Sequence, residues 1–178
     1  MLVSAEGKAI RFTVAELRSA SRSSGGVRGM RIASANDEVV GLEVVESGSM
    51  LLTISETGLG KRTDFSEYPK HSRGGQGVLT HNVTARTGRV VAARAVRDDY
   101  ELMLISQSGI VIRTNVGSIA KVGRSAQGVH VMQPPAGDRV ASVAIIDLSK
   151  TPADTTSTNG TENGATNGRR PRGRGSRR

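Results

Sequence analysis

The sequence has no cysteine and no tryptophan, and it has only two phenylalanines and two tyrosines in 178 residues. Without cysteine there is no disulfide framework and no thiolate metal site, which fits a reducing cytoplasm. No apolar run approaches the ~18 residues that a membrane span needs, and no signal peptide is recognisable. The histidines His71, His81 and His130 fall at no metal-ligand spacing. We therefore expect a cytoplasmic protein with no membrane contact and no metal.

Motifs for nucleotide binding and catalysis are also missing. The closest approach to a phosphate-binding P-loop is GLGKRT, but Arg62 stands where the Mg²⁺-binding hydroxyl belongs and Ser55 stands where the first glycine belongs. There is no Gly-x-Gly-x-x-Gly fingerprint, no catalytic triad and no recurring pair of carboxylates. These absences predict a chain without a cofactor and without catalytic residues, so that it is not an enzyme by itself.

Positive charge is abundant, with a formal net charge of +9. Residues 149–178 carry seven basic and two acidic side chains, a net +5, which leaves +4 for residues 1–148. A basic excess in both parts indicates a polyanionic partner, although a basic protein without such a partner is an open alternative. The segment 149–178 is polar and ends in RRPRGRGSRR, so we expect a disordered linker followed by an arginine-rich tail.

The most informative feature is a period of 51 residues, which aligns the chain with itself three times without a gap. MLVSAEGKAIRFTVAELRSASRSSGGV matches LTISETGLGKRTDFSEYPKHSRGGQGV and then MLISQSGIVIRTNVGSIAKVGRSAQGV. Apolar stretches follow each unit at 39–45, 90–96 and 140–146. Six positions are identical in all three copies, namely Ser4/Ser55/Ser106, Gly7/Gly58/Gly109, Arg11/Arg62/Arg113, Arg22/Arg73/Arg124, Gly26/Gly77/Gly128 and Val27/Val78/Val129. Such a period indicates an array of units that bury their faces on one another.

The local patterns in each repeat are those of β-strands. Short β-branched runs end at glycines, SETGLGKR and SQSGIVIR are typical of hairpins, and short helical turns are expected at TVAELRSA and DFSEYP. We predict an all-β, propeller-like array with about four strands per blade and blades near 1–48, 49–99 and 100–148. Three blades are fewer than the four to eight that close a propeller. The array is then either a piece of a longer protein, which we favour, or its exposed ends pair with another chain.

The repeated arginines are the candidate binding residues. In a radial array, equivalent positions fall on the same rim, where two arginines per blade would form a positive track. The alternative is that they join blades by bonding backbone carbonyls or acids such as Glu16, Asp64 and Glu67. The residues predicted to bind the polyanion are Lys8, Arg11, Arg22, Arg28, Arg31, Lys61, Arg62, Lys70, Arg73, Arg113, Lys121 and Arg124.

The scarcity of aromatic residues narrows the type of polyanion. Binders of single strands and RNA stack bases on aromatic side chains, and here Phe65 and Tyr68 look like residues that pack the blades. A positive rim without stacking platforms should hold the phosphate backbone of a duplex, with little regard to sequence. A curved rim would bend this duplex, at a cost on the order of 1–6 kcal/mol for a 40–90° bend.

The phrases GLGKRTDFSEYP and GRSAQGV, together with the repeat, resemble the C-terminal β-pinwheel of DNA gyrase A or its topoisomerase IV relative. The resemblance covers 1–148 and implies a disc that wraps duplex DNA to support supercoiling by a type II topoisomerase. Strand cleavage and ATP hydrolysis would lie elsewhere, and the other domains of gyrase A and the whole of gyrase B would be partners. A noncatalytic module for protein interaction or structural support is the alternative, and an independent enzyme ranks third.

The family carries a box with the sequence Gln-Arg-Arg-Gly-Gly-Lys-Gly, usually in its first blade. The stretch HSRGGQG at 71–77 matches this box at Arg73, Gly74, Gly75 and Gly77 and differs at the other three positions. The resemblance therefore implies that 71–77 is the equivalent loop of a later blade. The arginine-rich tail differs from the acidic tails common in the family, and we expect it to add nonspecific affinity for DNA.

Overall fold

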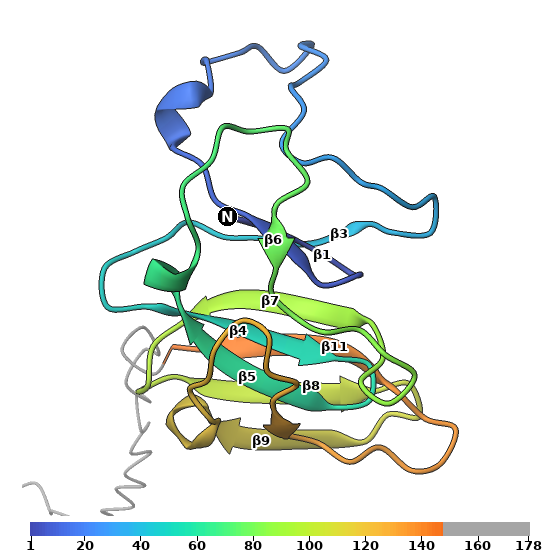
Figure 1. The fold of residues 1–178 in the computed structure, drawn as a ribbon. Coiled ribbons are helices and arrows are strands. Elements are labelled where there is room, and N and C mark those ends of the chain that lie inside the picture. The colour runs from blue at the N-terminus through green and yellow to red at the C-terminus, as the bar shows by residue number, and fades with distance from the viewer. Residues whose placement is uncertain (148–178) are drawn as a thin grey trace, which may run out of the picture.

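Short β-branched runs separated by glycine turns fold into antiparallel sheets, as the sequence predicts. The computed structural model describes residues 1–147, so the predicted linker and arginine-rich tail at 149–178 lie outside the described residues. The strands are Leu2–Ser4 (β1), Lys8–Ile10 (β2), Val39–Leu42 (β3), Met50–Ser55 (β4), Leu59–Asp64 (β5), Val78–Leu79 (β6), Val90–Val96 (β7), Glu101–Ser106 (β8), Val111–Asn115 (β9), Val129–His130 (β10) and Val140–Ile146 (β11) (Figure 1). Within residues 1–147, no helix is long and apolar enough to cross a membrane.

The three sheets are linked because a repeat contributes a strand to the sheet of the repeat before it. The first blade has the strand order β3-β1-β2-β6 and the second has β10-β5-β4-β7. Each of these blades therefore takes one edge strand, β6 or β10, from the following repeat. Val78 lies opposite Ala9, and Val129 lies opposite Gly60. The third blade has the order β11-β8-β9 in the described part of the chain. Blades of about four strands are confirmed, and the Gly-Val segment of one repeat completes the blade before it.

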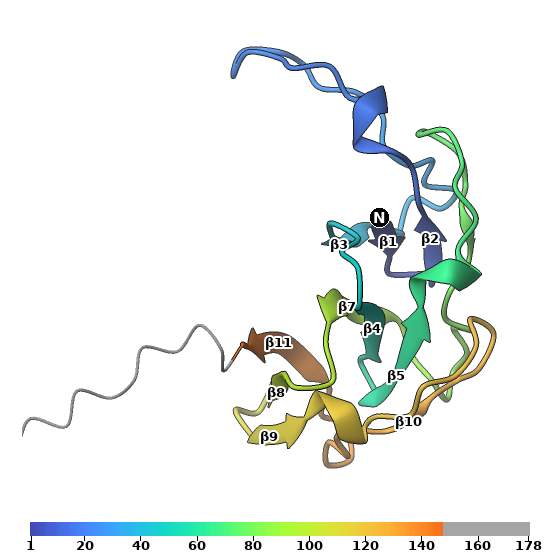
Figure 2. The same cartoon turned by 90° about the vertical axis from the view of Figure 1, so that its left-hand side faces the viewer.

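A 3₁₀ turn follows the hairpin of each repeat, at Val14–Glu16 (η1), Phe65–Glu67 (η2) and Val116–Ser118 (η3). The first two occupy the stretches TVAELRSA and DFSEYP, where the sequence predicts helical turns. Asp64 caps η2, because its Oδ1 accepts a hydrogen bond from the Ser66 N–H at 2.9 Å. After η2 and η3 the chain crosses to the preceding blade, and Figure 2 shows the three sheets fanned about the side where β3, β7 and β11 come closest.

The core lies between successive blades. Alternation along β4 sends Leu51 into a cluster with Val3 and Phe65 of the first junction, while Leu52 and Ile54 face a second cluster with Leu102. Both faces of the middle blade are therefore buried. Tyr68 packs in the first cluster with its ring 6.5 Å from that of Phe65, which confirms that these two aromatics serve packing.

The hairpin glycines differ in what surrounds them. Gly58 and Gly109 both have positive φ, at +82° and +87°. A Cβ on Gly58 would lie 2.1 Å from the carbonyl oxygen of Met132, whereas a Cβ on Gly109 would have no atom of the described chain within 4 Å. A side chain at Gly109 thus costs only the strain of the left-handed backbone, whereas a side chain at Gly58 would also clash with the backbone of Met132.

Gly58→Ala is therefore expected to lower the free energy of unfolding by about 3 kcal/mol, and Gly109→Ala by about 1 kcal/mol. Urea denaturation at submicromolar protein concentration measures both. Equal losses for the two variants would mean that the Met132 carbonyl does not approach Gly58 this closely.

Candidate nucleic-acid interface

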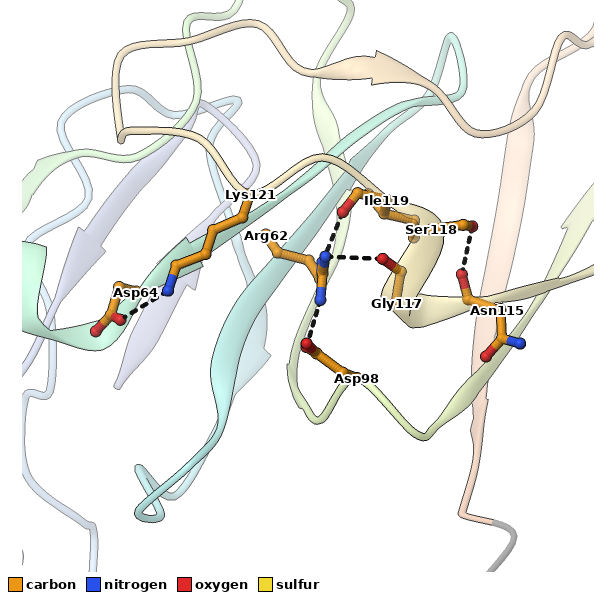
Figure 3. Close-up of polar contacts among 8 residues, drawn as sticks. All are labelled: Arg62, Asp64, Asp98, Asn115, Gly117, Ser118, Ile119 and Lys121. Atoms are coloured by element: carbon orange, nitrogen blue, oxygen red, sulfur yellow. Dashed lines mark hydrogen bonds and ion pairs between the residues drawn. The ribbon is translucent and has the colours of Figure 1, made fainter.

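The first arginine column points between the blades. Arg62 is 6% exposed. Its Nε donates to the Ile119 carbonyl at 2.7 Å, its Nη2 donates to the Gly117 carbonyl at 3.0 Å, and its Nη1 pairs with Asp98 (Figure 3). The guanidinium joins the second blade to the turn η3, so the prediction that Arg62 projects outward toward DNA is wrong.

Of the other two members of this column, Arg11 also joins two blades, whereas within residues 1–147 Arg113 does not. Arg11 is half-buried, and its Nη1 donates to the Phe65 and Tyr68 carbonyls at 2.8 and 3.4 Å. Its guanidinium is likewise directed into a junction, which contradicts the outward placement. Arg113 is exposed and pairs with Glu101 on the neighbouring strand β8.

Lys61 is also directed inward. Its side chain is buried, and Nζ donates to the carbonyls of Gly123 and Arg124 at 2.9 and 2.5 Å. Burial lowers the pKa of this ammonium to about 8, with Glu67 opposing the shift. The prediction that Lys61 lies on an outward-facing rim is therefore wrong, because its ammonium group fastens the loop of the third repeat to the second blade.

The second column, Arg22/Arg73/Arg124, is closer to the surface. Arg22 is exposed, Arg73 donates from Nη1 to the Arg28 carbonyl at 3.2 Å, and Arg124 donates to the Leu79 carbonyl at 3.1 Å. The last guanidinium also lies 5.9 Å from the centre of the Tyr68 ring. Arg73 and Arg124 each bind a carbonyl of the preceding repeat, while part of each guanidinium stays accessible.

Carboxylates complete the attachment of these loops. Glu16 Oε2 accepts the Arg73 N–H at 3.0 Å, and Glu67 Oε2 accepts the Arg124 N–H at 3.1 Å. Two of the acids considered as joining residues therefore bind the loop backbone rather than the arginine side chains. The carboxylate paired with Arg62 is Asp98, which the sequence did not indicate because Ser47 replaces it in the first repeat.

The remaining predicted residues, Lys8, Arg28, Arg31, Lys70 and Lys121, are exposed. The Arg31 N–H donates to the Gly75 carbonyl at 2.9 Å, and the Gly74 N–H donates to the Gly29 carbonyl at 2.7 Å. These bonds place Arg28 and Arg31 beside the loop 71–77, and we name Arg28, Arg31 and Arg73 the junction cluster. Lys121 differs, since its Nζ lies 3.3 Å from Asp64.

The sequence matches the family described as DNA gyrase C-terminal domain, beta-propeller, over residues 1–46, 49–97 and 100–147. The A subunit of DNA gyrase from Dehalogenimonas lykanthroporepellens is 41% identical over 150 residues, which cover 81% of this chain and 18% of that protein. The A subunit of DNA gyrase from Mycobacterium tuberculosis is 42% identical over 146 residues, which cover 81% of this chain and 17% of that protein. The chain thus spans less than a fifth of the length of these relatives.

Solved structures agree with this match. The C-terminal domain of DNA gyrase A superposes with a TM-score of 0.75 at 31% identity, over 82% of this chain and 50% of that one. The C-terminal domain of DNA topoisomerase IV gives a TM-score of 0.76 at 22% identity, over 82% and 46%, and so supports the fold. Strand-exchanged sheets with basic crossing loops define a repeat domain of the β-propeller class. Within that class, the chain belongs to the DNA gyrase C-terminal domain family.

Proposed function

We propose that this chain binds and wraps duplex DNA as a noncatalytic part of a gyrase-type type II topoisomerase, supporting DNA supercoiling. The observation that carries the proposal is the junction cluster, where three arginines from two repeats lie on two neighbouring loops that hydrogen bonds hold together. Its partners would be double-stranded DNA, the rest of gyrase A and the whole of gyrase B, in the nucleoid region of the cytoplasm. The relatives support this role, because they are gyrase A proteins.

The charge distribution favours the junction between the first and second repeats as the main contact. At the second junction, Leu79 and Asn82 stand where Arg28 and Arg31 stand at the first. Lys121 is partly neutralised there by Asp64. Phosphates should therefore be held mainly by the junction cluster, with Arg22 and Lys70 near it in sequence and Lys8 opposite Leu79 in the first sheet.

The burial of the phenylalanines and tyrosines favours recognition of DNA through its phosphates rather than through its bases. Phe65 and Tyr68 are buried, and Phe12 and Tyr100 are half-buried. No phenylalanine or tyrosine in residues 1–147 is classed as exposed, so neither residue type offers an open ring for stacking on a base. The expected mode is binding that depends strongly on salt and weakly on sequence.

A gel-shift titration of duplex DNA over a salt series tests the proposal. Arg22, Arg28 and Arg31 donate no side-chain hydrogen bond that the fold needs within the described residues, so their joint replacement by alanine should spare the fold. It is expected to reduce the slope of log K against log salt by about 2–3 and to weaken binding at least ~10-fold.

The control removes an equal charge elsewhere, by replacing Arg86, Arg97 and Arg139 with alanine. These arginines are exposed, and the last two pair with Glu46 and Glu56. Affinity that ignores salt, or equal slopes for the two triple variants, would overturn the proposed interface.

The second candidate is the noncatalytic interaction or structural module. It is favoured by large apolar side chains left exposed on the first repeat, including Val14 and Leu42. Sedimentation with and without duplex DNA separates the candidates, because only the first requires DNA to change the sedimenting mass.

A further inference from the structure

The crossing loop 122–128 is held from beneath by the second blade. Lys61 is buried, and its Nζ donates to the carbonyls of Gly123 and Arg124 at 2.9 and 2.5 Å. The Oε2 of Glu67 accepts the Arg124 N–H at 3.1 Å. Two side chains of the second repeat thus fix the backbone of this loop.

The equivalent loop 71–77 has only part of this support. The carboxylate contact to the loop backbone is kept. Ile10, however, stands where Lys61 stands in the next repeat, so the ammonium that fastens the later loop has no counterpart here. A hollow of about 340 Å³ lies between Ile10 and the loop, whose residues Ser72 and Gln76 also line it. The position of this loop therefore depends on contacts at its side.

Those contacts come from the segment 28–31 of the first repeat. The Gly74 N–H donates to the Gly29 carbonyl at 2.7 Å, and the Gly75 carbonyl accepts the Arg31 N–H at 2.9 Å. These two backbone hydrogen bonds lay the segment along the loop. They bring together the arginines of the junction cluster, which belong to different repeats.

Gly74 has the backbone conformation on which this contact depends. Its φ is +83°, in the left-handed region that residues with a side chain rarely adopt. A Cβ at this position would lie 3.6 Å from the Arg28 carbonyl oxygen and 3.8 Å from the Arg28 Cδ, which are ordinary contact distances. There is thus room for a side chain, and the aliphatic part of Arg28 packs beside the glycine. Glycine is needed here for its backbone conformation rather than for its small size.

The second junction lacks the whole arrangement. Three residues of the first junction are replaced together, namely Gly74 by Ser125, Arg28 by Leu79 and Arg31 by Asn82. Among residues 1–147, no backbone–backbone hydrogen bond joins the loop 122–128 to the segment 79–82. The glycine, the backbone bonds and the pair of arginines therefore occur together at one junction and are missing together at the other.

We propose that Gly74 is the positioning residue of the proposed phosphate site. Its left-handed backbone docks the segment 28–31 on the loop 71–77 and thereby assembles the junction cluster. Arginines that are already held side by side lose less conformational freedom when a phosphate backbone binds them. The inference rests on the proposed function for its ligand, whereas the assembly of the cluster can be measured without DNA.

Replacements of Gly74 that leave the net charge unchanged provide the first test. Asparagine tolerates positive φ better than serine does. In gel-shift titrations of duplex DNA with the 178-residue chain, the affinity should fall from the parent to Gly74→Asn and further to Gly74→Ser. We expect a loss of ~10-fold for the serine variant and a reduction of its salt slope by about 1–2. Equal affinities, or weaker binding by the asparagine variant than by the serine variant, would overturn the proposal.

A double-mutant comparison separates positioning from a general weakening of the fold. In a chain that already carries Arg28→Ala and Arg31→Ala, Gly74→Ser should cost less than about 2-fold in affinity, because the arginines that it positions are gone. The same loss in both backgrounds would contradict the positioning role.

Gly137→Ser is the matched control for backbone strain. Gly137 also has positive φ, at +84°, and a Cβ there would have no atom of the described chain within 4 Å. Its replacement should strain the backbone to a similar degree and leave the affinity for DNA unchanged. A loss of affinity as large as that of Gly74→Ser would show that strain alone weakens binding.

Hydrogen exchange of the Arg31 N–H, measured by NMR without DNA, reports on the assembly itself. Gly74→Ser should accelerate this exchange by ~10-fold or more, and Gly74→Asn by less. Unchanged exchange would overturn the positioning role, whatever the result with DNA. If the exchange responds as expected but no chain binds duplex DNA in a salt-dependent way, the positioning role stands and the proposed function fails.

Discussion

Arg62→Ala is expected to lower the free energy of unfolding by about 2–4 kcal/mol, which would lower the melting temperature by roughly 6–12 °C for a domain of this size. The substitution removes the donors to the Ile119 and Gly117 carbonyls and the cation beside Asp98. Ile119 is buried, so its carbonyl would lose its partner without gaining water. Arg62→Ala should therefore lower the stability of the junction between blades more than it lowers the affinity for DNA.

Arg97→Ala is the matched control for this prediction. Arg97 also pairs with an acid, Glu46 at 3.8 Å, but both side chains are largely exposed. Its loss should change the unfolding free energy by less than about 1 kcal/mol. Thermal and urea denaturation measure both variants, and similar losses for the two would show that Arg62 does not act as a joining residue.

His81→Met is expected to stabilise the chain at acidic pH and to remove much of its acid sensitivity. The imidazole is fully buried, and neither ring nitrogen has a hydrogen-bond partner among the described residues. The positions that match it in the other repeats are Met30 and Met132, both buried in the apolar core. Methionine at position 81 therefore fits a site that the chain already builds twice around this residue.

The pH dependence follows from the lowered pKa of His81. Burial first, and the nearby charge of Lys61 second, lower this pKa from 6.5 to about 4. The folded chain thus keeps a neutral imidazole at a pH where the unfolded chain takes up a proton. The contribution to stability is complete above pH ~6.5 and is lost as the pH falls toward ~4, a total of about 3 kcal/mol.

Urea denaturation of the parent and His81→Met chains between neutral pH and pH 4 provides the measurement. The difference in unfolding free energy between the two should widen by about 3 kcal/mol over this range. Carboxylates titrate in both chains and cancel in the comparison. Curves that run parallel would mean that His81 is solvated or paired in the folded state.

Much of the fold could be predicted from the sequence because its signals are local. Gly58 and Gly109 mark the hairpins, since positive φ is needed there, and both adopt it. The aromatic residues of DFSEYP are predicted to pack blades, and Phe65 and Tyr68 do so. Strand exchange was not predicted, because a period of 51 residues shows that units repeat without showing which unit a strand joins.

The direction of the arginines could not be predicted for a similar reason. An arginine repeated in every copy, such as Arg11, Arg62 and Arg113, fits two tasks equally well, because both joining blades and binding phosphate demand repetition. A better signal was available at Lys61 and His81. Each replaces a residue that is apolar in the other two copies, which indicates a buried position more strongly than it indicates a surface charge.

Because each of the first two blades is completed by the following repeat, neither of these repeats is an independent folding unit. Cutting the chain between β5 and β6 would deprive the first blade of its outer strand and separate Tyr68 from Thr80, whose hydroxyls are 2.5 Å apart. Heat or denaturant should consequently melt residues 1–147 in a single cooperative transition rather than blade by blade. Gain or loss of a repeat during evolution is easiest when the new unit supplies both a strand to its predecessor and an edge to its successor.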